Sequence, residues 1–363
     1  SPSSSFKTRQ TRPVSGDRFP MPRDLKIIHV GLGPIGVGIA KMVLGKEGLK
    51  VVGACDPAPD KASKDLGDVL GIGRKLKVKV AGDPVKFIKS ARADVAVVST
   101  TSSAKVVKAT IEALLNRGIN VVTTCEEFAY PAPSNLKVFK DLDVVAKKKK
   151  VSVLGTGVNP GFAMDALALT LTAPCEKVTR VSVTRVVDAG TRRLPLQRKV
   201  GAGLTMAQFS RAKAEGTVRH VGLPESIQMI ADALGFKLER VEESLEPAIA
   251  PRDLNTDYLR IAAGTAAGIK QHARGYSKDG LVISLELHMY VGADSPRDHI
   301  VIDGSPSMDM MVKGGIAGDI ATAAISVNAI PKVMAARPGV MTMRDIPFIH
   351  SYNKDEARNP PKK

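Results

Sequence analysis

Three glycines at a fixed spacing, Gly31, Gly33 and Gly36, constrain the fold of this 363-residue chain more than any other feature. They follow residues 26–30, a short apolar run rich in β-branched side chains that predicts a buried strand, and they precede residues 37–44, which are compatible with a helix. In a strand–turn–helix unit, such glycines allow a tight turn, close approach of the backbone to a phosphate, and close packing of helix on strand. The sequence therefore predicts a Rossmann-type unit that binds a dinucleotide.

An acidic residue at the end of the next predicted strand agrees with this interpretation. Asp56 follows residues 51–55 and stands 20 positions after Gly36, where a carboxylate accepts hydrogen bonds from an adenosine ribose. This position favours NAD(H), and we expect NADP(H) to bind as well if a nearby cation reaches its 2′-phosphate. The candidate cations are Lys61, Lys64, Arg74 and Lys75.

Strands and helices alternate along the first half of the chain. Residues 94–98, 120–123 and 151–154 are further predicted strands, and residues 104–116 have an amphipathic helix pattern. Such alternation indicates βαβ units and a parallel sheet. After residue 161 the pattern changes to long strands with few helices between them, which indicates a mixed or antiparallel sheet with helices on one face. The later strands are predicted at residues 177–187, 281–291 and 299–302, and the later helices at residues 204–214, 223–234 and 318–336.

We therefore predict an α/β protein with two domains. The first is a Rossmann NAD(P)-binding domain at residues 26–155, completed by residues 318–350, and the second is a mixed-sheet α/β substrate and dimerisation domain at residues 156–317. Long strands rich in β-branched residues in the second domain suit a sheet-based homodimer. Residues 1–25 are rich in Ser and Arg and nearly free of acidic residues, which is typical of a transit peptide or a disordered extension. The predicted location is the cytoplasm, or an organelle if this extension is a transit peptide.

Composition argues against several classes of function. No apolar run approaches the about 18 residues of a membrane span, and three cysteines without a CxxC motif argue against a disulfide framework or a zinc ribbon. Lys and Arg outnumber Asp and Glu by 53 to 36. Because these cations gather at the chain ends and in surface turns such as residues 147–150, and because tryptophan is absent, we interpret them as a solvated surface and expect no nucleic-acid partner. Six histidines without ligand spacing argue against a catalytic metal, and we expect His220, His272 and His288 to be structural.

Polar side chains follow the predicted parallel strands at the edge where open α/β sheets bind ligands. Glu126 and Glu127 come just after residues 120–123, and a carboxylate there can act as a general base or hold an ammonium group. The alternative is an acid at a helix start that complements the helix dipole. Asn159, in a glycine-rich segment, is a candidate to bond a nicotinamide amide. The full set predicted to bind the cofactor is Gly31, Gly33, Pro34, Ile35, Gly36, Asp56, Ser99, Thr100, Thr101, Cys125, Asn159 and Asn328.

Several longer motifs carry a resemblance to a known family. They are the Rossmann start, TTCEEFAYP at 123–131, GTGVNPGFAMD at 155–165, VDAGTRRLPLQRKVGAG at 187–203, VGLPES at 221–226 and GDIATAAISVNAIPKV at 318–333. Together, and in this order, they resemble the native amine dehydrogenases, relatives of 2,4-diaminopentanoate dehydrogenase. The resemblance implies NAD(P)-dependent interconversion of an amine with a ketone or aldehyde plus ammonia.

A glutamate beyond the fourth strand is catalytic in that family, and the resemblance assigns this role to Glu126, with Glu127 as the second choice. The similar homoserine dehydrogenases carry a functional lysine two residues after a stretch that aligns with residues 121–124, and this alignment also favours Glu126. Reductive amination needs a base that accepts the proton of ammonium, which a carboxylate can do. Apolar candidates to line the substrate pocket are Val158, Phe162, Ala163 and Met164.

Two other functions stay open. A diamino acid dehydrogenase requires a cation for the substrate carboxylate, for which Arg185 and Arg192 are candidates. A non-catalytic, dinucleotide-sensing regulator requires no reactive carboxylate and predicts that the region around Glu126 is dispensable.

Overall fold

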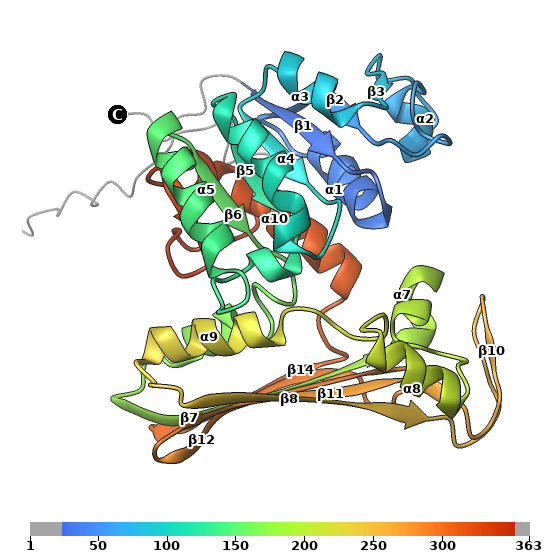
Figure 1. Ribbon diagram of the computed structural model, residues 1–363, viewed down its shortest axis with the longest axis vertical. Helices are drawn as coiled ribbons and strands as arrows, with labels where there is room; N and C mark the ends of the chain where they lie inside the picture. The colour runs from blue at the N-terminus through green and yellow to red at the C-terminus, as the bar shows by residue number, and fades with distance from the viewer. Residues whose placement is uncertain (1–23, 353–363) are drawn as a thin grey trace, which may run out of the picture.

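The computed structural model describes residues 24–352, so all but the last two residues of the predicted N-terminal extension lie outside it. Two β-sheets organise the described chain (Figure 1). The first sheet has helices on both faces, and the second has helices on one face.

The first sheet has seven strands in the order β15-β6-β5-β4-β1-β2-β3, and all neighbouring strands run parallel. Its strands are β1 (Leu25–Val30), β2 (Leu49–Cys55), β3 (Val80–Ala81), β4 (Val95–Val98), β5 (Asn120–Thr123), β6 (Ser152–Gly155) and β15 (Gly339–Met341). They are almost continuously apolar because both faces of the sheet are covered. Ile27 packs into the core on one face, and its neighbour Ile28 packs into the core on the other.

Two pairs of helices cover this sheet. α1 and α10 pack together on one face, and α4 and α5 pack together on the other. The helices of this part are α1 (Pro34–Leu44), α2 (Leu66–Leu70), α3 (Pro84–Ser90), α4 (Ala104–Asn116), α5 (Leu136–Lys149) and α10 (Gly318–Ala335). The run of lysines at residues 147–150 closes α5, where cations complement the negative end of the helix dipole.

The second sheet has six strands in the order β14-β13-β7-β12-β11-β8, and only the β7–β12 pair is parallel. Its strands are β7 (Lys177–Asp188), β8 (Arg240–Ile249), β11 (Ala266–Ser277), β12 (Gly280–Tyr290), β13 (Arg297–Ser305) and β14 (Met308–Lys313). Side chains of α6 (Ala166–Leu171), α8 (Met206–Ala214) and α9 (Leu223–Leu234) pack on one face and close its core. The remaining elements are α7 (Leu194–Lys199), the short 3-10 helices η1 (Glu126–Phe128) and η2 (Ala189–Thr191), and a hairpin of β9 (Leu254–Asn255) and β10 (Arg260–Ile261).

The predicted fold class, a Rossmann-type parallel sheet beside a mixed sheet, is confirmed. Residues 61–70 are compatible with a helix by sequence, but only Leu66–Leu70 is helical, because the Asp65 side chain accepts a hydrogen bond from Gly67 N and caps the helix there. The C-terminal strand β15, which extends the first sheet, was not predicted. We keep the division into domains at residues 26–155 with 318–350, and 156–317, as a proposal.

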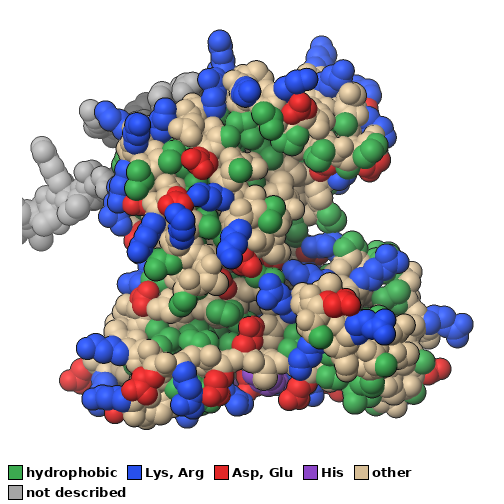
Figure 2. All heavy atoms as spheres, viewed as in Figure 1, with side chains coloured by type: hydrophobic (Ala, Val, Ile, Leu, Met, Phe, Trp, Pro, Cys, Tyr) green, Lys and Arg blue, Asp and Glu red, His purple; other side chains and the backbone are tan. Residues whose placement is uncertain are grey.

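The surface carries dispersed charge. On the face shown in Figure 2, Lys and Arg side chains are spread among acidic and apolar ones and do not gather into one large basic patch. Within residues 24–352, no helix combines the length and apolar character that crossing a bilayer requires.

Candidate active site

The three predicted glycines form the turn between β1 and α1, and each meets a different steric demand. Gly31 has φ +95°, and a Cβ there would lie 2.5 Å from the Ser99 carbonyl oxygen. A Cβ on Gly36 would lie 2.1 Å from the Gly31 carbonyl oxygen, so this glycine allows the helix to pack closely on the turn. A Cβ on Gly33 would meet no atom within 4 Å. Gly33 is the N-cap of α1 and its backbone is open to a ligand at the positive end of the helix dipole.

Asp56 lies just past the end of β2, where a ribose-binding carboxylate is expected. Its Oδ2 accepts a hydrogen bond from Leu32 N at 2.7 Å, its Oδ1 accepts one from Ala58 N at 2.9 Å, and Lys61 Nζ lies 3.2 Å from Oδ2. Burial acts to raise the pKa of Asp56, but the two backbone donors and the Lys61 ammonium outweigh it and hold the pKa below its usual value. The carboxylate is therefore ionised, and of the four predicted cations Lys61 contacts it.

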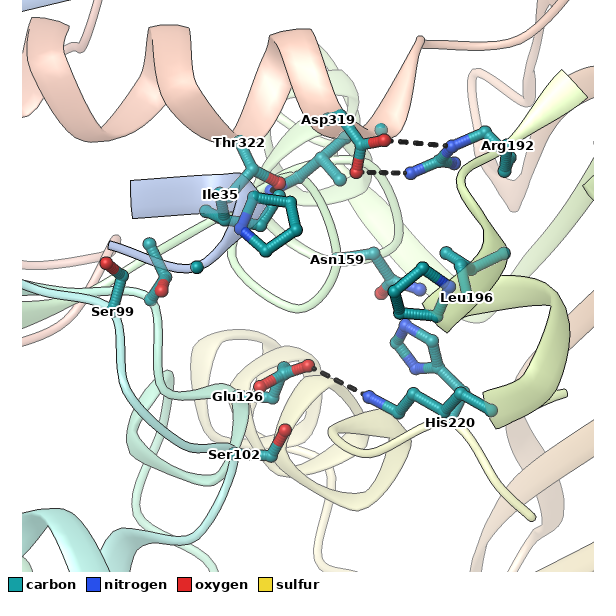
Figure 3. A pocket seen from close by; sticks show the side chains of 18 of the residues that line it. Ile35, Ser99, Ser102, Glu126, Asn159, Arg192, Leu196, His220, Asp319 and Thr322 are labelled. Carbon is teal, nitrogen blue, oxygen red and sulfur yellow. Dashed lines mark hydrogen bonds and ion pairs between the residues drawn. The ribbon is translucent and has the colours of Figure 1, made fainter. Parts of the chain in front are cut away.

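A pocket of about 380 Å³ opens between residues at one edge of the first sheet, such as Ser99 and Glu126, and Leu196 and His220 across from them (Figure 3). One wall comes from the carboxyl ends of β1, β4 and β5, which meet at the switch point of the strand order. The opposite wall comes from residues 192–193, α7 and residues 219–220, and the first turn of α10 closes one side. The predicted residues that line this pocket are Gly33, Pro34, Ile35, Ser99, Thr100, Thr101, Glu126, Val158 and Asn159.

The two adjacent glutamates point to different partners. Glu126 lines the pocket, and its Oε1 lies 3.4 Å from the Lys199 ammonium of α7. Glu127 Oε2 instead accepts a hydrogen bond from Ala104 N at 2.9 Å, at the N-terminus of α4. The Ser103 side chain at the N-cap of α4 makes no cap hydrogen bond, so the Glu127 side chain caps this helix instead. The geometry thus separates a pocket carboxylate from a helix-capping one.

Cys125 does not lie at the surface of the pocket. Its side chain is buried in the core beneath α4, and burial, followed by the Glu126 charge, raises the pKa of its thiol. Gly31, Gly36, Asp56 and Asn328 also lie outside the pocket lining. Gly31 and Gly36 act indirectly, because they allow the turn between β1 and α1 to fold.

Asn159 has the strongest unmet hydrogen-bonding demand in the pocket. It precedes a cis bond to Pro160, and both its Nδ2 and its Oδ1 are buried without a partner in residues 24–352. On α10, the buried Asn328 Oδ1 lacks a described partner as well. Buried amides require partners, so a ligand with a carboxamide satisfies Asn159. With the open Gly33 backbone, the residues present fit a nicotinamide dinucleotide.

A buried acid that sequence reasoning missed holds the Asn159 segment in place. Asp165 is fully buried and accepts hydrogen bonds from Gly161 N at 2.8 Å and Ser226 Oγ at 2.7 Å. Burial raises the pKa of Asp165 against the effect of these donors. Its only sequence signal was its place at the end of the GTGVNPGFAMD motif.

Cations line much of the pocket. Arg185 is fully buried beside Asp298, and Arg192 pairs with Asp319 of α10 at 2.7 Å. His220 also lines the pocket, and its pKa is lowered to about 3, first by burial and then by the positive charges of Lys199, Arg185 and Arg192. His220 is therefore neutral.

Of the four apolar residues predicted to line the substrate pocket, the structure places only Val158 there. Ala163 and Met164 are fully buried in hydrophobic cores, and Phe162 lines a separate groove beside α6 and residues 343–349. They turn away because the chain reverses after Gly161, which has φ +122°. The pocket residues missed by sequence reasoning include Arg193, Pro195, Leu196 and Lys199. They share the segment 187–203 with Arg192, the one residue of it that the sequence offered as a substrate-binding candidate.

This fold and pocket define a dehydrogenase that uses a nicotinamide dinucleotide. Residues 162–360 match the family model of the 2,4-diaminopentanoate dehydrogenase C-terminal domain, and residues 25–128 match that of the dihydrodipicolinate reductase N-terminus. The chain is 33% identical to 2,4-diaminopentanoate dehydrogenase of Acetoanaerobium sticklandii over 336 residues, which cover 89% of this chain and 93% of that protein. The chain belongs to the 2,4-diaminopentanoate dehydrogenase family.

Solved structures show the same fold. The amine dehydrogenase from Mycobacterium smegmatis superposes with a TM-score of 0.82 at 23% identity, covering 92% of this chain and 99% of that one. The scyllo-inositol dehydrogenase from Lactobacillus casei has a TM-score of 0.57 at 14% identity, covering 89% and 92%. Family membership makes the chain an NAD(P)-dependent oxidoreductase acting on amine groups. The alternative of a non-catalytic regulator is therefore set aside.

Proposed function

We propose that the substrate is a diamino acid similar to 2,4-diaminopentanoate, with Glu126 holding the reacting amine and Lys199 the carboxylate. One observation carries this proposal: Glu126 and Lys199 form an ion pair that lines the pocket, so an ammonium and a carboxylate on one substrate can each replace one partner. The other cations of the pocket are already paired. Arg185 pairs with Asp298, Arg192 and Arg193 pair with Asp319, and Arg219 pairs with Glu127.

The Glu126–Lys199 pair is the part of the pocket that can exchange partners. Arg185 is buried against Asp298, and Arg192 contacts Asp319 through two nitrogens, so both are already committed. Lys199 is 39% exposed and reaches Glu126 from the end of α7. When the substrate ammonium takes Glu126, Lys199 loses its partner, and a carboxylate on the same substrate replaces it. Arg185 and Arg192, the earlier candidates, then shape the pocket without binding the substrate.

Glu126 supplies the proton transfers of the reaction. In the direction of oxidation, Glu126 accepts a proton from the substrate ammonium and releases it to solvent, so that it is a carboxylate again before the hydride leaves. A bound nicotinamide would supply the hydride acceptor for the carbon that carries the nitrogen. The resulting iminium is stabilised by the carboxylate charge. Glu126 then accepts a proton from the attacking water and returns a proton to the departing nitrogen, so the products are a carbonyl group and ammonia.

The test of Glu126 uses its neighbour as a matched control. Glu126→Gln keeps the shape of the side chain but cannot accept a proton, so turnover should fall by about 100-fold or more, while the NAD(P)H dissociation constant, measured by fluorescence, stays near normal. Glu127→Gln keeps an oxygen that can accept from Ala104 N, and turnover should persist. If Glu127→Gln loses turnover and Glu126→Gln retains it, the assignment is wrong.

The test of Lys199 compares two substrates that differ by one carboxylate. Lys199→Met should raise KM for 2,4-diaminopentanoate by about 10- to 100-fold, the cost of losing a hydrogen bond to a charged group, and leave KM for butane-1,3-diamine unchanged. Lys199→Arg should restore most of the loss. An equal rise in KM for both substrates would refute carboxylate binding by Lys199. Turnover of either substrate would still support the amine dehydrogenase activity.

A simple alkyl amine is the second candidate substrate. Val158, Pro195 and Leu196 line the same pocket and offer apolar contact to an alkyl chain. If the wild-type chain turns over 2-aminopentane with a kcat/KM equal to that for 2,4-diaminopentanoate, the simple amine is favoured.

We further propose that two copies pair through the second sheet. Support comes from the face of this sheet that carries no helix among the described elements (Figure 1). Light scattering at micromolar concentration should give a dimer mass, and a monomer mass would contradict the proposal. The cellular location, cytoplasm or organelle, remains a prediction.

A further inference from the structure

Two histidines and a glutamate meet on the helix-free face of the second sheet. His272 on β11 stands directly opposite Glu286 on β12, and His288 follows two residues along β12. Successive side chains of a strand point to opposite faces. Leu285, Leu287 and Met289 of β12 belong to the core beneath the helices, so Glu286 and His288 face the other way. The cluster therefore lies on the opposite side of the sheet from the candidate active site.

The donor atoms of this cluster converge on one another without bonding. His272 Nδ1 lies 3.8 Å from Glu286 Oε1, and His288 Nε2 lies 3.9 Å from Glu286 Oε2. The donor atoms of the three residues all lie within 4.8 Å of one another. Both of these ring nitrogens are shielded from solvent, and neither has a hydrogen-bond partner in the described chain. Three polar groups that face one another beyond hydrogen-bond distance leave room for a bridging atom.

We propose that His272, Glu286 and His288 bind a zinc ion. Two imidazoles and one carboxylate are a common ligand set for Zn²⁺, at bond lengths of about 2.0–2.2 Å. Ligands around a tetrahedral ion with such bonds lie about 3.4 Å apart. The two nitrogen–oxygen separations here exceed this by about half an ångström, which small side-chain rotations close. The strands hold the three side chains in register, so the site needs no rearrangement of the backbone.

The ion would join neighbouring strands and take no part in the dehydrogenase reaction. β11 and β12 are central strands of the second sheet. A ligand from each strand makes the ion a cross-link between them, and binding to the folded state alone stabilises the fold by mass action. Three protein ligands leave a fourth position for water.

The test measures zinc binding to the full-length chain and its variants. After treatment with EDTA and removal of the chelator, titration with ZnCl₂ should show one tightly bound zinc per chain. Glu286→Gln and His288→Gln should each weaken binding by at least about tenfold, since even residues that only orient a ligand contribute this much. The matched control is His299→Gln on β13, two strands from Glu286, where His299 pairs with Asp309 at 2.8 Å; this variant should bind zinc as the wild type does. All variants keep the three cysteines, so zinc bound to a thiol would not differ among them.

Two results would overturn the proposal. One is the absence of stoichiometric zinc binding to the wild-type chain. The other is equal affinity in the wild type, Glu286→Gln and His288→Gln. Circular dichroism checks that each variant is folded, and Co²⁺ absorption bands typical of nitrogen and oxygen ligands provide a second measurement on the wild type. Zinc removal should lower Tm and leave kcat unchanged; a kcat that depends on zinc would refute the structural role.

Discussion

Alanine at Gly33 provides the sharpest test of where the dinucleotide binds. Gly33 has φ −62° and ψ 178°, an extended conformation that alanine adopts without strain. A Cβ at this position meets no atom within 4 Å. We therefore expect Gly33→Ala to fold as the wild type does, with a stability change within about 1 kcal/mol that favours alanine, because the unfolded chain loses conformational freedom.

The cost of Gly33→Ala should appear only when the cofactor binds. In this kind of turn the second glycine lets the backbone approach the pyrophosphate, and the added methyl group occupies that space. Losing one hydrogen bond to a charged phosphate costs about 1.5–3 kcal/mol, which is about 10- to 100-fold in Kd. Gly36→Ala is the opposite control, because its Cβ would lie 2.1 Å from the Gly31 carbonyl oxygen and 2.6 Å from Ser99 Oγ. That overlap should destabilise the fold by about 1–3 kcal/mol.

The assay combines thermal unfolding of both variants with a fluorescence titration of NADH and NADPH. The expected pattern is an unchanged Tm with weak binding for Gly33→Ala, and a lowered Tm for Gly36→Ala. If Gly33→Ala binds both dinucleotides with wild-type affinity, the pyrophosphate does not lie at this turn and the assignment of the glycines is wrong.

Two further substitutions test charges in the described chain. Asp56→Ser removes the carboxylate that favours a ribose hydroxyl and repels a 2′-phosphate, so the ratio of the two dissociation constants should shift toward NADP(H) by at least about tenfold; an unchanged ratio in the same titration would refute this role. Burial raises the pKa of Glu225 from 4.5 to about 7, so its contribution to stability is full below pH 4.5 and is lost as pH rises through about 7. Glu225→Gln should therefore raise the free energy of unfolding at pH 8 by an amount on the order of 3 kcal/mol at most, measured as a higher Tm, and leave Tm unchanged at pH 4; an equal gain at both pH values would contradict this reasoning.

The sequence was sufficient for the elements whose stability is local. Residues 104–116 and 223–234 were predicted as helices and form α4 and α9 with the same bounds. The strands β8 and β11 escaped prediction for different reasons. β8 is an edge strand with most of its side chains exposed, so its residues alternate poorly between polar and apolar. β11 carries glycines within it, and its pairing on both sides supplies the stability that its own residues do not.

Only the wall of the pocket that the first sheet provides could be predicted from the sequence. Glu126 follows a strand of the first sheet, so the rule that ligands bind at the carboxyl ends of parallel strands located it. Its partner Lys199 lies 73 residues further along the chain on a short helix, and no periodicity connects the two. The zinc cluster shows the same limit, because His272 and Glu286 become neighbours only through the register of β11 and β12.

Two ion pairs, Lys199–Glu126 and Arg192–Asp319, connect the two walls of the pocket. Arg192 lies just before α7, and Lys199 is the last residue of α7. Both side chains contact residues of the part of the chain that is built on the first sheet. Lys199 pairs with Glu126, and Arg192 pairs with Asp319 of α10. In the proposed binding mode, Arg192 stays paired with Asp319 when a substrate binds, whereas Lys199 and Glu126 separate. When the Lys199–Glu126 pair opens, the Arg192–Asp319 pair therefore still holds the α7 segment against α10. A substrate with both an ammonium and a carboxylate restores two ionic contacts across the pocket, and a simple amine restores one. The proposed preference for a diamino acid thus follows from the same contacts that keep the two walls of the pocket together.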